Sequence, residues 1–420
     1  MGEVPAGPPS HVYTLKRRPR VIWVAAVLLV SLIGGNVGGV RETTHLEELW
    51  PDPEEMVEQM EGLISQNNTS NEMKVLIIGI DGVRGDVAQD VAEKEDSTFG
   101  SIMEEGAWSF NVDVGPYAVS GPGWASMLTG VWCDRHGVVD NTFRGSQLES
   151  VPDLFEFIEN HDQNQSTAAV YRWEPIDEHI LGEGSADWRE GYDTDEKVRD
   201  RAVELLTDEP DLDVLFVSMD DVDATGHDEG FSPDVPEYVA AVERAENMTA
   251  DILDALGARD QSQETWLVII TSDHGGGGRF LKMHHPSTLI DRNTFMLVTG
   301  GSAIQGEMTN DPVIIDVAVM ALNHLEVPLP EGEEALDGRN SAFDSTVPPA
   351  REPTCEKPIF YYRVNLMAAL VGTCCLSICA RVIFITVRLR KQRQGRGKLG
   401  GMSHPNEDVI PADVGNSHSE

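Results

Sequence analysis

The sequence predicts an α/β fold with a mostly parallel central sheet and helices on both faces. Short, continuous apolar runs, which are typical of strands buried on both faces, alternate with helical patterns along the chain. Aspartates and histidines follow the ends of three of these runs, as expected when strands deliver polar residues to one edge of a sheet. The chain has 420 residues, 40% of them hydrophobic, which is enough for one large domain.

Five apolar runs predict the strands, and the segments between them predict the helices. The runs are KVLIIGI (74–80), STAAVY (166–171), DVLFVSM (213–219), TWLVIIT (265–271) and TFMLVTG (294–300). Helical patterns cover 122–130, 151–160, 195–207, 235–257 and 312–325. Repeated alternation of this kind favours a single α/β domain, which we expect at residues 73–340.

Charge is distributed unevenly along the chain. The formal net charge is −40, yet residues 42–362 contain 18 Lys and Arg against 66 Asp and Glu. Such an acidic surface disfavours nucleic-acid binding, which depends on neutralising phosphates. It would also repel a phosphate ester unless bound metals reversed the local charge.

Two apolar stretches bracket the acidic middle and predict a membrane protein. Both stretches adjoin basic residues, so the positive-inside rule places both chain ends in the cytosol and the domain in an extracellular or lumenal space. The membrane would be crossed once or twice, because the first stretch fits a signal peptide or a short signal anchor. The predicted segments are a basic cytoplasmic N-terminus (1–20), the signal segment (21–35), an acidic stalk (36–72), a linker (341–362), a transmembrane helix (363–388) and a basic, then disordered, cytoplasmic tail (389–420).

Cysteines and glycosylation motifs agree with this placement without proving it. Cys133 and Cys355 lie in the acidic middle, where they could form a disulfide or remain two free thiols. Asn-x-Ser/Thr motifs, which would suit a glycoprotein, occur at Asn67, Asn68, Asn164 and Asn247.

Three clusters of candidate metal ligands follow three of the predicted strands. A single Asp at such a position is often only the N-cap of the next helix. Three clusters together, two of them with histidine, favour divalent metals, and the mixture of nitrogen and oxygen ligands favours Zn²⁺ over Mg²⁺. The candidates are Asp81, Asp223, His227, Asp273, His274 and His284.

Ser120 is the candidate nucleophile. It begins a Gly/Pro-rich turn that leads into a helix, where free backbone N–H groups could bind an anion. A serine hydroxyl needs a base or a metal to become nucleophilic, and no Gly-x-Ser-x-Gly motif surrounds this one. Metal activation is therefore the natural route. Taken alone, Ser120 fits a helix-capping role equally well.

Four motifs resemble the type I phosphodiesterase/nucleotide pyrophosphatase family of the alkaline phosphatase superfamily. They are IIGIDG (77–82), SGPGWASMLTGVWCDRHGVVDN (120–141), DDVDATGH (220–227) and TSDHGG (271–276). The resemblance implies an alkaline-phosphatase-like sandwich with two Zn²⁺ ions and a phospho- or nucleotidyl-enzyme formed on Ser120. It implies that one zinc is held by Asp81, Asp273 and His274, and the other by Asp223, His227 and His284.

The chain departs from the family pattern at three places. The family phosphodiesterases usually have Thr where Ser120 stands, whereas phosphatases of the superfamily have Ser, so both diesters and monoesters stay open as substrates. Gly123 replaces a common asparagine and, with the neighbouring Trp124, is a candidate substrate contact, although an aromatic residue in an apolar segment more often packs its helix onto the sheet. The position of the last histidine ligand is ambiguous, because two histidines are adjacent: His284 is the expected ligand and His285 is the alternative.

The leading hypothesis is a membrane-anchored hydrolase of phosphodiesters or nucleotide pyrophosphates, with a small phosphate ester as its substrate. An extracellular phosphomonoesterase is the alternative within the fold. A non-catalytic adhesion or receptor ectodomain is a third possibility, but it predicts loss of metal ligands. A sulfatase is disfavoured, because residues 120–124 lack the arginine of the C/S-x-P-x-R motif.

Overall fold

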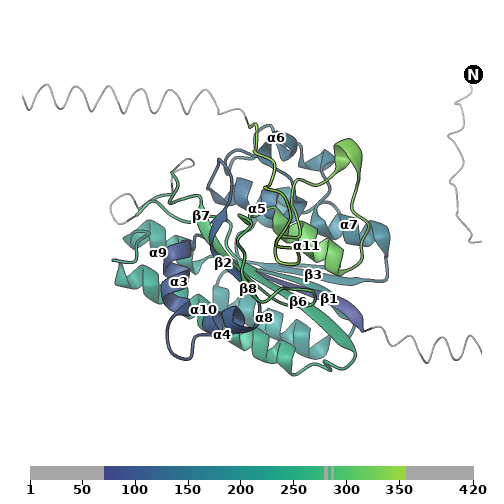
Figure 1. Ribbon diagram of the computed structural model, residues 1–420, viewed down its shortest axis with the longest axis horizontal. Coiled ribbons are helices and arrows are strands. Elements are labelled where there is room, and N and C mark those ends of the chain that lie inside the picture. Colours follow the sequence, from purple (N-terminus) through teal and green to yellow (C-terminus); the bar gives the residue numbers. More distant parts are fainter. Residues whose placement is uncertain (1–70, 279–281, 285–287, 356–420) are drawn as a thin grey trace, which may run out of the picture. The chain divides into compact units, whose positions relative to one another are not determined.

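The computed structural model describes residues 71–278, 282–284 and 288–355, which form an eight-stranded mixed sheet (Figure 1). The strand order is β4-β3-β5-β1-β6-β7-β2-β8, and β7 alone runs antiparallel to its neighbours. The predicted α/β class with a mostly parallel sheet is therefore confirmed. The strands are β1 (Glu72–Ile80), β2 (Ala107–Asp113), β3 (Ser166–Tyr171), β4 (Trp188–Gly191), β5 (Leu212–Met219), β6 (Glu264–Thr271), β7 (Asn293–Gly300) and β8 (Gly306–Glu307).

Helices cover both faces of the sheet (Figure 1). Two separate apolar cores lie between the helices and the two faces. One core is covered by α5 (Ser120–Thr129), α7 (Leu154–His161) and α11 (Asp316–His324). The other is covered by α3 (Gly85–Ala92), α4 (Thr98–Glu105), α8 (Asp195–Asp208) and α10 (Pro236–Gly257). The short helices α6 (Cys133–His136) and α9 (Asp221–Glu229) follow α5 and β5.

The central strand β1 has an apolar sequence from Val75 to Ile80 because both of its faces are covered there. Val75 and Ile77 enter one core, while Leu76, Ile78 and Ile80 enter the other. Successive side chains of a strand point to opposite faces, so a strand covered on both faces needs apolar residues at every position. This burial places the end of β1, and the aspartate that follows it, in the middle of the domain.

Three strands were not predicted from the sequence. β2 pairs antiparallel with β7 and carries polar residues such as Asn111, while β4 and β8 lie at the two edges of the sheet and are short. The predicted helix over 312–325 begins only at Asp316, since Val313 bridges to Asp113 at the end of β2. Edge elements have weak apolar patterns because only part of their surface is buried.

A disulfide ties the end of the described chain to the domain. Cys133 and Cys355 are bonded, with their Cα atoms 5.7 Å apart, so the alternative of two free thiols is wrong. Arg351 pairs nearby with Asp134 and Asp337. The segment up to residue 355 therefore belongs to the folded domain, although its Pro-rich sequence is typical of a linker.

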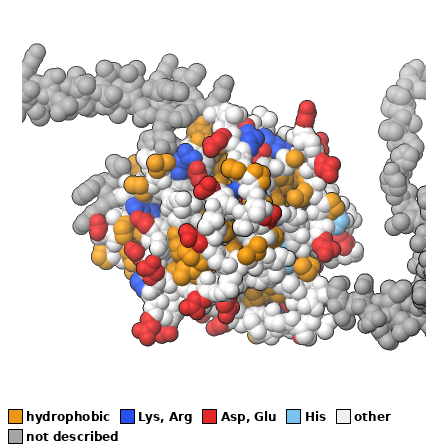
Figure 2. Space-filling view, viewed as in Figure 1, with side chains coloured by type: hydrophobic (Ala, Val, Ile, Leu, Met, Phe, Trp, Pro, Cys, Tyr) orange, Lys and Arg blue, Asp and Glu red, His pale blue; other side chains and the backbone are white. Residues whose placement is uncertain are grey.

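The predicted membrane segments, 21–35 and 363–388, lie outside the described residues. Within the ranges that the structure describes, no helix is both long and apolar enough to cross a bilayer. Acidic side chains are spread over the visible face of the domain among smaller groups of Lys and Arg (Figure 2).

Candidate active site

The three predicted ligand clusters meet at the carboxyl edge of the sheet. Asp81 follows β1, Asp223 lies in the first turn of α9 after β5, and Asp273 follows β6. These strands are neighbours in the order β5-β1-β6, so their ends converge although they lie far apart in sequence. Ser120 enters from the start of α5, and His284 from the loop after β6.

Asp81, Asp273 and His274 form what we call the inner triad. All three side chains are fully buried. The Nε2 atom of His274 lies 3.4 Å from Oδ1 of Asp81 and 3.4 Å from Oδ2 of Asp273. Trp124 donates its indole N–H to the other oxygen of Asp81 at 3.1 Å, and the backbone N–H of Gly82 reaches Asp273 at 3.2 Å. One oxygen of each carboxylate is thus held in place by a donor.

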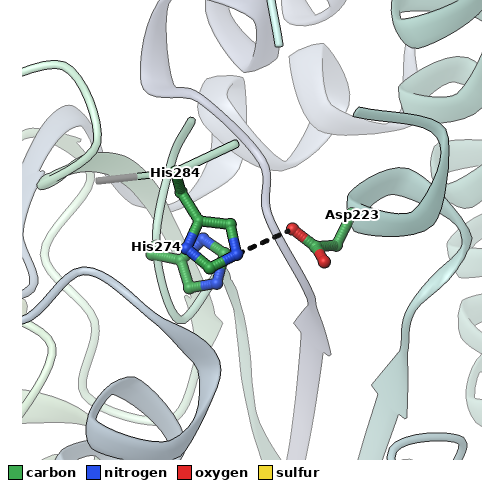
Figure 3. Close-up of side chains that lie close together, drawn as sticks. All are labelled: Asp223, His274 and His284. Carbon is green, nitrogen blue, oxygen red and sulfur yellow. Dashed lines mark ion pairs between the residues drawn. The ribbon is translucent and has the colours of Figure 1, made fainter. Parts of the chain in front are cut away.

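Asp223, His227 and His284 form the outer triad. His227 Nε2 lies 3.2 Å from Asp223 Oδ2 and 3.2 Å from His284 Nε2. His284 Nε2 lies 3.7 Å from Asp223 Oδ1, across the gap drawn in Figure 3. The ring of His284 lies 4.1 Å from that of His274, so His274 borders both triads. His285, the alternative ligand, lies outside the described residues.

All three histidines direct the same ring nitrogen, Nε2, toward the carboxylates of the two triads. Each has Nδ1 against a backbone carbonyl oxygen, which can only accept a hydrogen bond, so in the neutral form of each ring Nδ1 carries the proton and Nε2 has the lone pair. Metal-binding histidines are typically oriented in this way. The pairs are His274 with Gly275 (2.7 Å), His227 with Lys282 (3.1 Å) and His284 with Ala118 (3.2 Å).

Burial and crowding shift the pKa values of these groups. Burial lowers the pKa of His274 to about 4 and that of His284 to about 3, so both rings are neutral near pH 7. Burial, together with the charges of neighbouring aspartates, raises the pKa of Asp81 and of Asp273. The hydrogen bond to Asp223 raises the pKa of the more exposed His227 to about 9.

This donor set suits divalent cations. Oδ1 of Asp81, Oδ1 of Asp223 and Oδ2 of Asp273 are buried and accept no hydrogen bond within the described part of the chain. The first and last of these oxygens face the Nε2 lone pair of a neutral His274, and such an arrangement is unfavourable unless a proton or a metal cation lies between the lone pairs. Ligating atoms of Asp81, Asp273 and His274 lie within 4.8 Å of one another, as do those of Asp223, His274 and His284.

Ser120 lies at the edge of the inner triad. It is 3% exposed, and its Oγ lies 3.4 Å from His274 Nε2. The start of α5 offers fewer free amides than the sequence suggested. The N–H of Gly121 is bonded to Oδ1 of Asn141 (2.7 Å), Pro122 has none, and the N–H of Gly123 bonds the carbonyl of Val119. Asn141 was not among the predicted site residues, although it closes the second of the four motifs.

Trp124 and Gly123 are buried in the contact between α5 and the inner triad. Trp124 is fully buried, so no face of its indole can stack on a substrate, and its polar atom is bonded to Asp81. Gly123 is also buried, and a Cβ at this position would lie 2.5 Å from the carbonyl oxygen of Asp273. Both residues pack α5 against the inner triad, which agrees with the packing role expected as the alternative for Trp124.

Asp195 positions the outer triad from a distance in sequence. This fully buried carboxylate accepts hydrogen bonds from the backbone N–H groups of Asp220 (2.9 Å) and Asp221 (2.8 Å), which form the start of α9 just before Asp223. Arg172, at the end of β3, pairs with Asp195 at 3.2 Å and with Asp221. No sequence motif links Asp195 to the site, because α8 meets α9 only through the fold.

Comparisons with known proteins assign the family. A model of the type I phosphodiesterase/nucleotide pyrophosphatase family matches residues 75–333, which is more than half of the chain. The chain belongs to this family. An uncharacterized pyrophosphatase/phosphodiesterase of Schizosaccharomyces pombe is 26% identical over 179 residues, covering 38% of this chain and 36% of the relative. The match thus spans about a third of that relative's length.

Solved structures show similar folds at low identity. Murine ectonucleotide pyrophosphatase/phosphodiesterase 5, inactive and in complex with AMP, is 14% identical and covers 62% of this chain and 97% of its own, with a TM-score of 0.49. A 2-O GAG sulfatase is 15% identical and covers 63% of this chain and 72% of its own, with a TM-score of 0.50. The likeness to the sulfatase extends to the fold alone.

Proposed function

We propose that this protein is a metal-dependent phosphoric ester hydrolase that acts on phosphodiesters or nucleotide pyrophosphates through Ser120. The observation that carries the proposal is the convergence of both triads beside the Ser120 hydroxyl. Family membership supports the reaction class. A non-catalytic ectodomain would have no need to keep three unpartnered carboxylate oxygens facing neutral histidines.

The metal proposed for both triads is zinc. Asp81, Asp273 and His274 would hold one ion, and Asp223, His227 and His284 the other. When bound, two zinc ions would act as Lewis acids that favour an ionised nucleophile and balance phosphoryl charge. Mixed nitrogen and oxygen ligands favour Zn²⁺ over Mg²⁺ or Ca²⁺.

The residues of the chain supply the nucleophile and hold it in position. The Oγ atom of Ser120 would bond to phosphorus as the bond to the leaving-group oxygen breaks, which yields a phospho- or nucleotidyl-serine that water then hydrolyses. Asn141 holds the first turn of α5 through the Gly121 N–H and so fixes the direction of Ser120. Trp124, one turn further along α5, fixes the distance between this helix and Asp81.

We also propose that the domain lies outside the cytosol, anchored by the apolar segment at 363–388. The Cys133–Cys355 disulfide supports this placement, because disulfides persist mainly in oxidising compartments. Asn164 and Asn247 are exposed and would be open to glycosylation.

The nucleophile and the metals are tested together. The purified full chain is assayed with a bis-aryl phosphate diester and with the matching aryl monoester, before and after chelation and zinc replacement. The Ser120→Ala variant is compared with Ser126→Ala, a change on the same helix whose hydroxyl contacts His136. We expect loss of turnover only in Ser120→Ala, and loss on chelation that zinc restores.

Two results would contradict the proposal. Full activity in Ser120→Ala would exclude this residue as nucleophile, and activity that survives thorough chelation would exclude the metal mechanism. A strong preference for the monoester would instead favour an extracellular phosphomonoesterase, the second candidate, which the serine nucleophile also supports.

A further inference from the structure

Phe231 is a fully buried aromatic residue that packs against two histidines of the outer triad. It follows α9, and the centre of its ring lies 5.3 Å from that of His227 and 5.9 Å from that of His284. Both imidazoles stand nearly perpendicular to the phenyl ring, at 86° and 84°. Edge-to-face contacts are a favoured geometry of aromatic pairs, so Phe231 favours one orientation of each imidazole.

Two glycines make room for the Phe231 ring. A Cβ at Gly226, the residue before His227, would lie 2.3 Å from an atom of this ring, and a Cβ at Gly276 would lie 2.1 Å from it. Gly276 comes two residues after His274, which borders both triads. The phenyl ring is therefore wedged between α9 and the segment that follows β6, and close packing of this kind leaves it little freedom to move.

The position of Phe231 is fixed by residues that follow β1. Its carbonyl oxygen accepts a hydrogen bond from a terminal nitrogen of Arg84 at 2.9 Å. Its ring packs 5.5 Å from the ring of Tyr238, whose hydroxyl donates a hydrogen bond to the carbonyl oxygen of Gly82 at 2.6 Å. Since Gly82 directly follows Asp81, Phe231 is tied to the same part of the sheet that carries the inner triad.

The outer triad needs such a support because its two histidines come from separate elements. His227 belongs to α9, whereas His284 belongs to the segment 282–284 of the loop after β6. Their Nε2 atoms lie 3.2 Å apart. The hydrogen bond at Nδ1 of each ring fixes one atom but leaves the ring plane free to turn about it, and contact with one shared phenyl ring restricts both planes.

We propose that Phe231 is a positioning residue that fixes the rings of His227 and His284 and thereby sets the metal affinity of the outer triad. Phe231 acts only through these two histidines. The inference rests on the proposed function, since it assumes that the outer triad holds zinc. Altering a residue that orients metal ligands typically changes metal affinity by about 10–100-fold.

The test measures metal binding and ligand geometry and not turnover. Zinc affinities of the purified full chain are determined by chelator competition in high salt, which screens weak binding to the acidic surface. The visible absorption spectrum of the Co²⁺-substituted protein reports the geometry of the ligands. His227→Ala identifies which of the two affinities belongs to the outer triad.

Two variants carry the same substitution in the same core. Phe231→Leu keeps an apolar side chain but removes the planar ring beside the histidines. Phe99→Leu is the matched control, because Phe99 is also fully buried in this core and its ring pairs with that of Phe295. Phe231→Met, with a flexible apolar side chain, provides the same comparison if the leucine variant does not fold.

We expect Phe231→Leu to weaken zinc binding at the outer triad by about 10–100-fold, to change the Co²⁺ spectrum and to leave the affinity of the inner triad unchanged. Phe99→Leu should lower the melting temperature of the metal-free protein to a similar extent and keep both zinc affinities.

Unchanged outer affinity in Phe231→Leu would overturn the proposal. Equal weakening of both ions, or the same outer loss in Phe99→Leu, would also overturn it, since Phe231 would then contribute only to the core. A wild-type chain that binds fewer than two zinc ions would instead contradict the proposed function.

Discussion

The inner triad has no solvent-exposed side chain, whereas His227 of the outer triad is 42% exposed. The two groups are adjacent and have similar ligands, yet their supports differ. Asp81 directly follows β1 and Asp273 lies two residues after β6, and these two central strands are paired along their length. The residues of the outer triad come from a short helix and from the segment 282–284 of a loop.

This difference indicates that the rigidity of each triad depends on the element that carries its residues, a paired central strand or a short helix and a loop. Local opening is easiest where few buried contacts oppose it, and hardest in paired central strands. The inner triad should therefore be a permanent part of the fold, while the outer triad should open independently. The following predictions test that contrast.

The largest effect is expected from His274, which borders both triads. His274→Ala should lower kcat/KM by about a thousandfold or more, because a catalytic metal contributes several kcal/mol of transition-state stabilisation. His227→Ala should lower kcat/KM by a smaller factor, since it removes one exposed residue that belongs to the outer triad alone. Steady-state kinetics with measured zinc content checks this order, and a larger loss in His227→Ala would contradict the contrast.

Metal release should occur in two phases. With excess chelator, the outer ion should leave first and the inner ion later. A difference of about 3 kcal/mol in opening free energy would separate the two rates by about a hundredfold. A zinc-sensitive dye in a stopped-flow instrument follows both phases. Release of both ions in a single phase would show that the triads open together.

Supporting residues should affect the triads separately. Trp124→Phe removes the indole N–H that holds Asp81, and Asp195→Asn weakens the acceptor that holds the start of α9. Each change should weaken zinc binding at its own triad by about 10–100-fold, as is typical of residues that orient metal ligands. Chelator competition measures both affinities. Equal weakening of both ions by either variant would mean that the triads are not independent.

The zinc affinity of the outer triad should depend on pH because of His227. Its pKa of about 9 means that the metal-free ring is protonated at pH 7, and this proton must leave before zinc can bind. This residue alone should therefore raise the outer affinity about tenfold per pH unit between pH 7 and 9, and add nothing above pH 9. Comparing the pH dependence of wild type and His227→Ala isolates the effect. Identical slopes would exclude His227 as a ligand.

Much of the central sheet could be predicted from sequence, but its margins could not. STAAVY coincides with β3, and the runs at 213–219 and 265–271 each fall one residue short of β5 and β6. These strands are buried on both faces, so their sequences carry a strong apolar signal. β4 and β8 have no such signal, because edge strands are stabilised by neighbours that the local sequence does not reveal.

The amino-acid sequence was sufficient to predict that Asp81, Asp223 and Asp273 meet at one edge of the sheet, because polar groups after buried parallel strands gather at the carboxyl ends of those strands. The depth at which each side chain is buried, the hydrogen bond from Trp124 to Asp81, and the contact of Asp195 with the start of α9 became visible only in the folded structure. These outcomes depend on contacts between segments far apart in the chain. Burial and pKa are properties of such contacts and cannot be read from neighbouring residues.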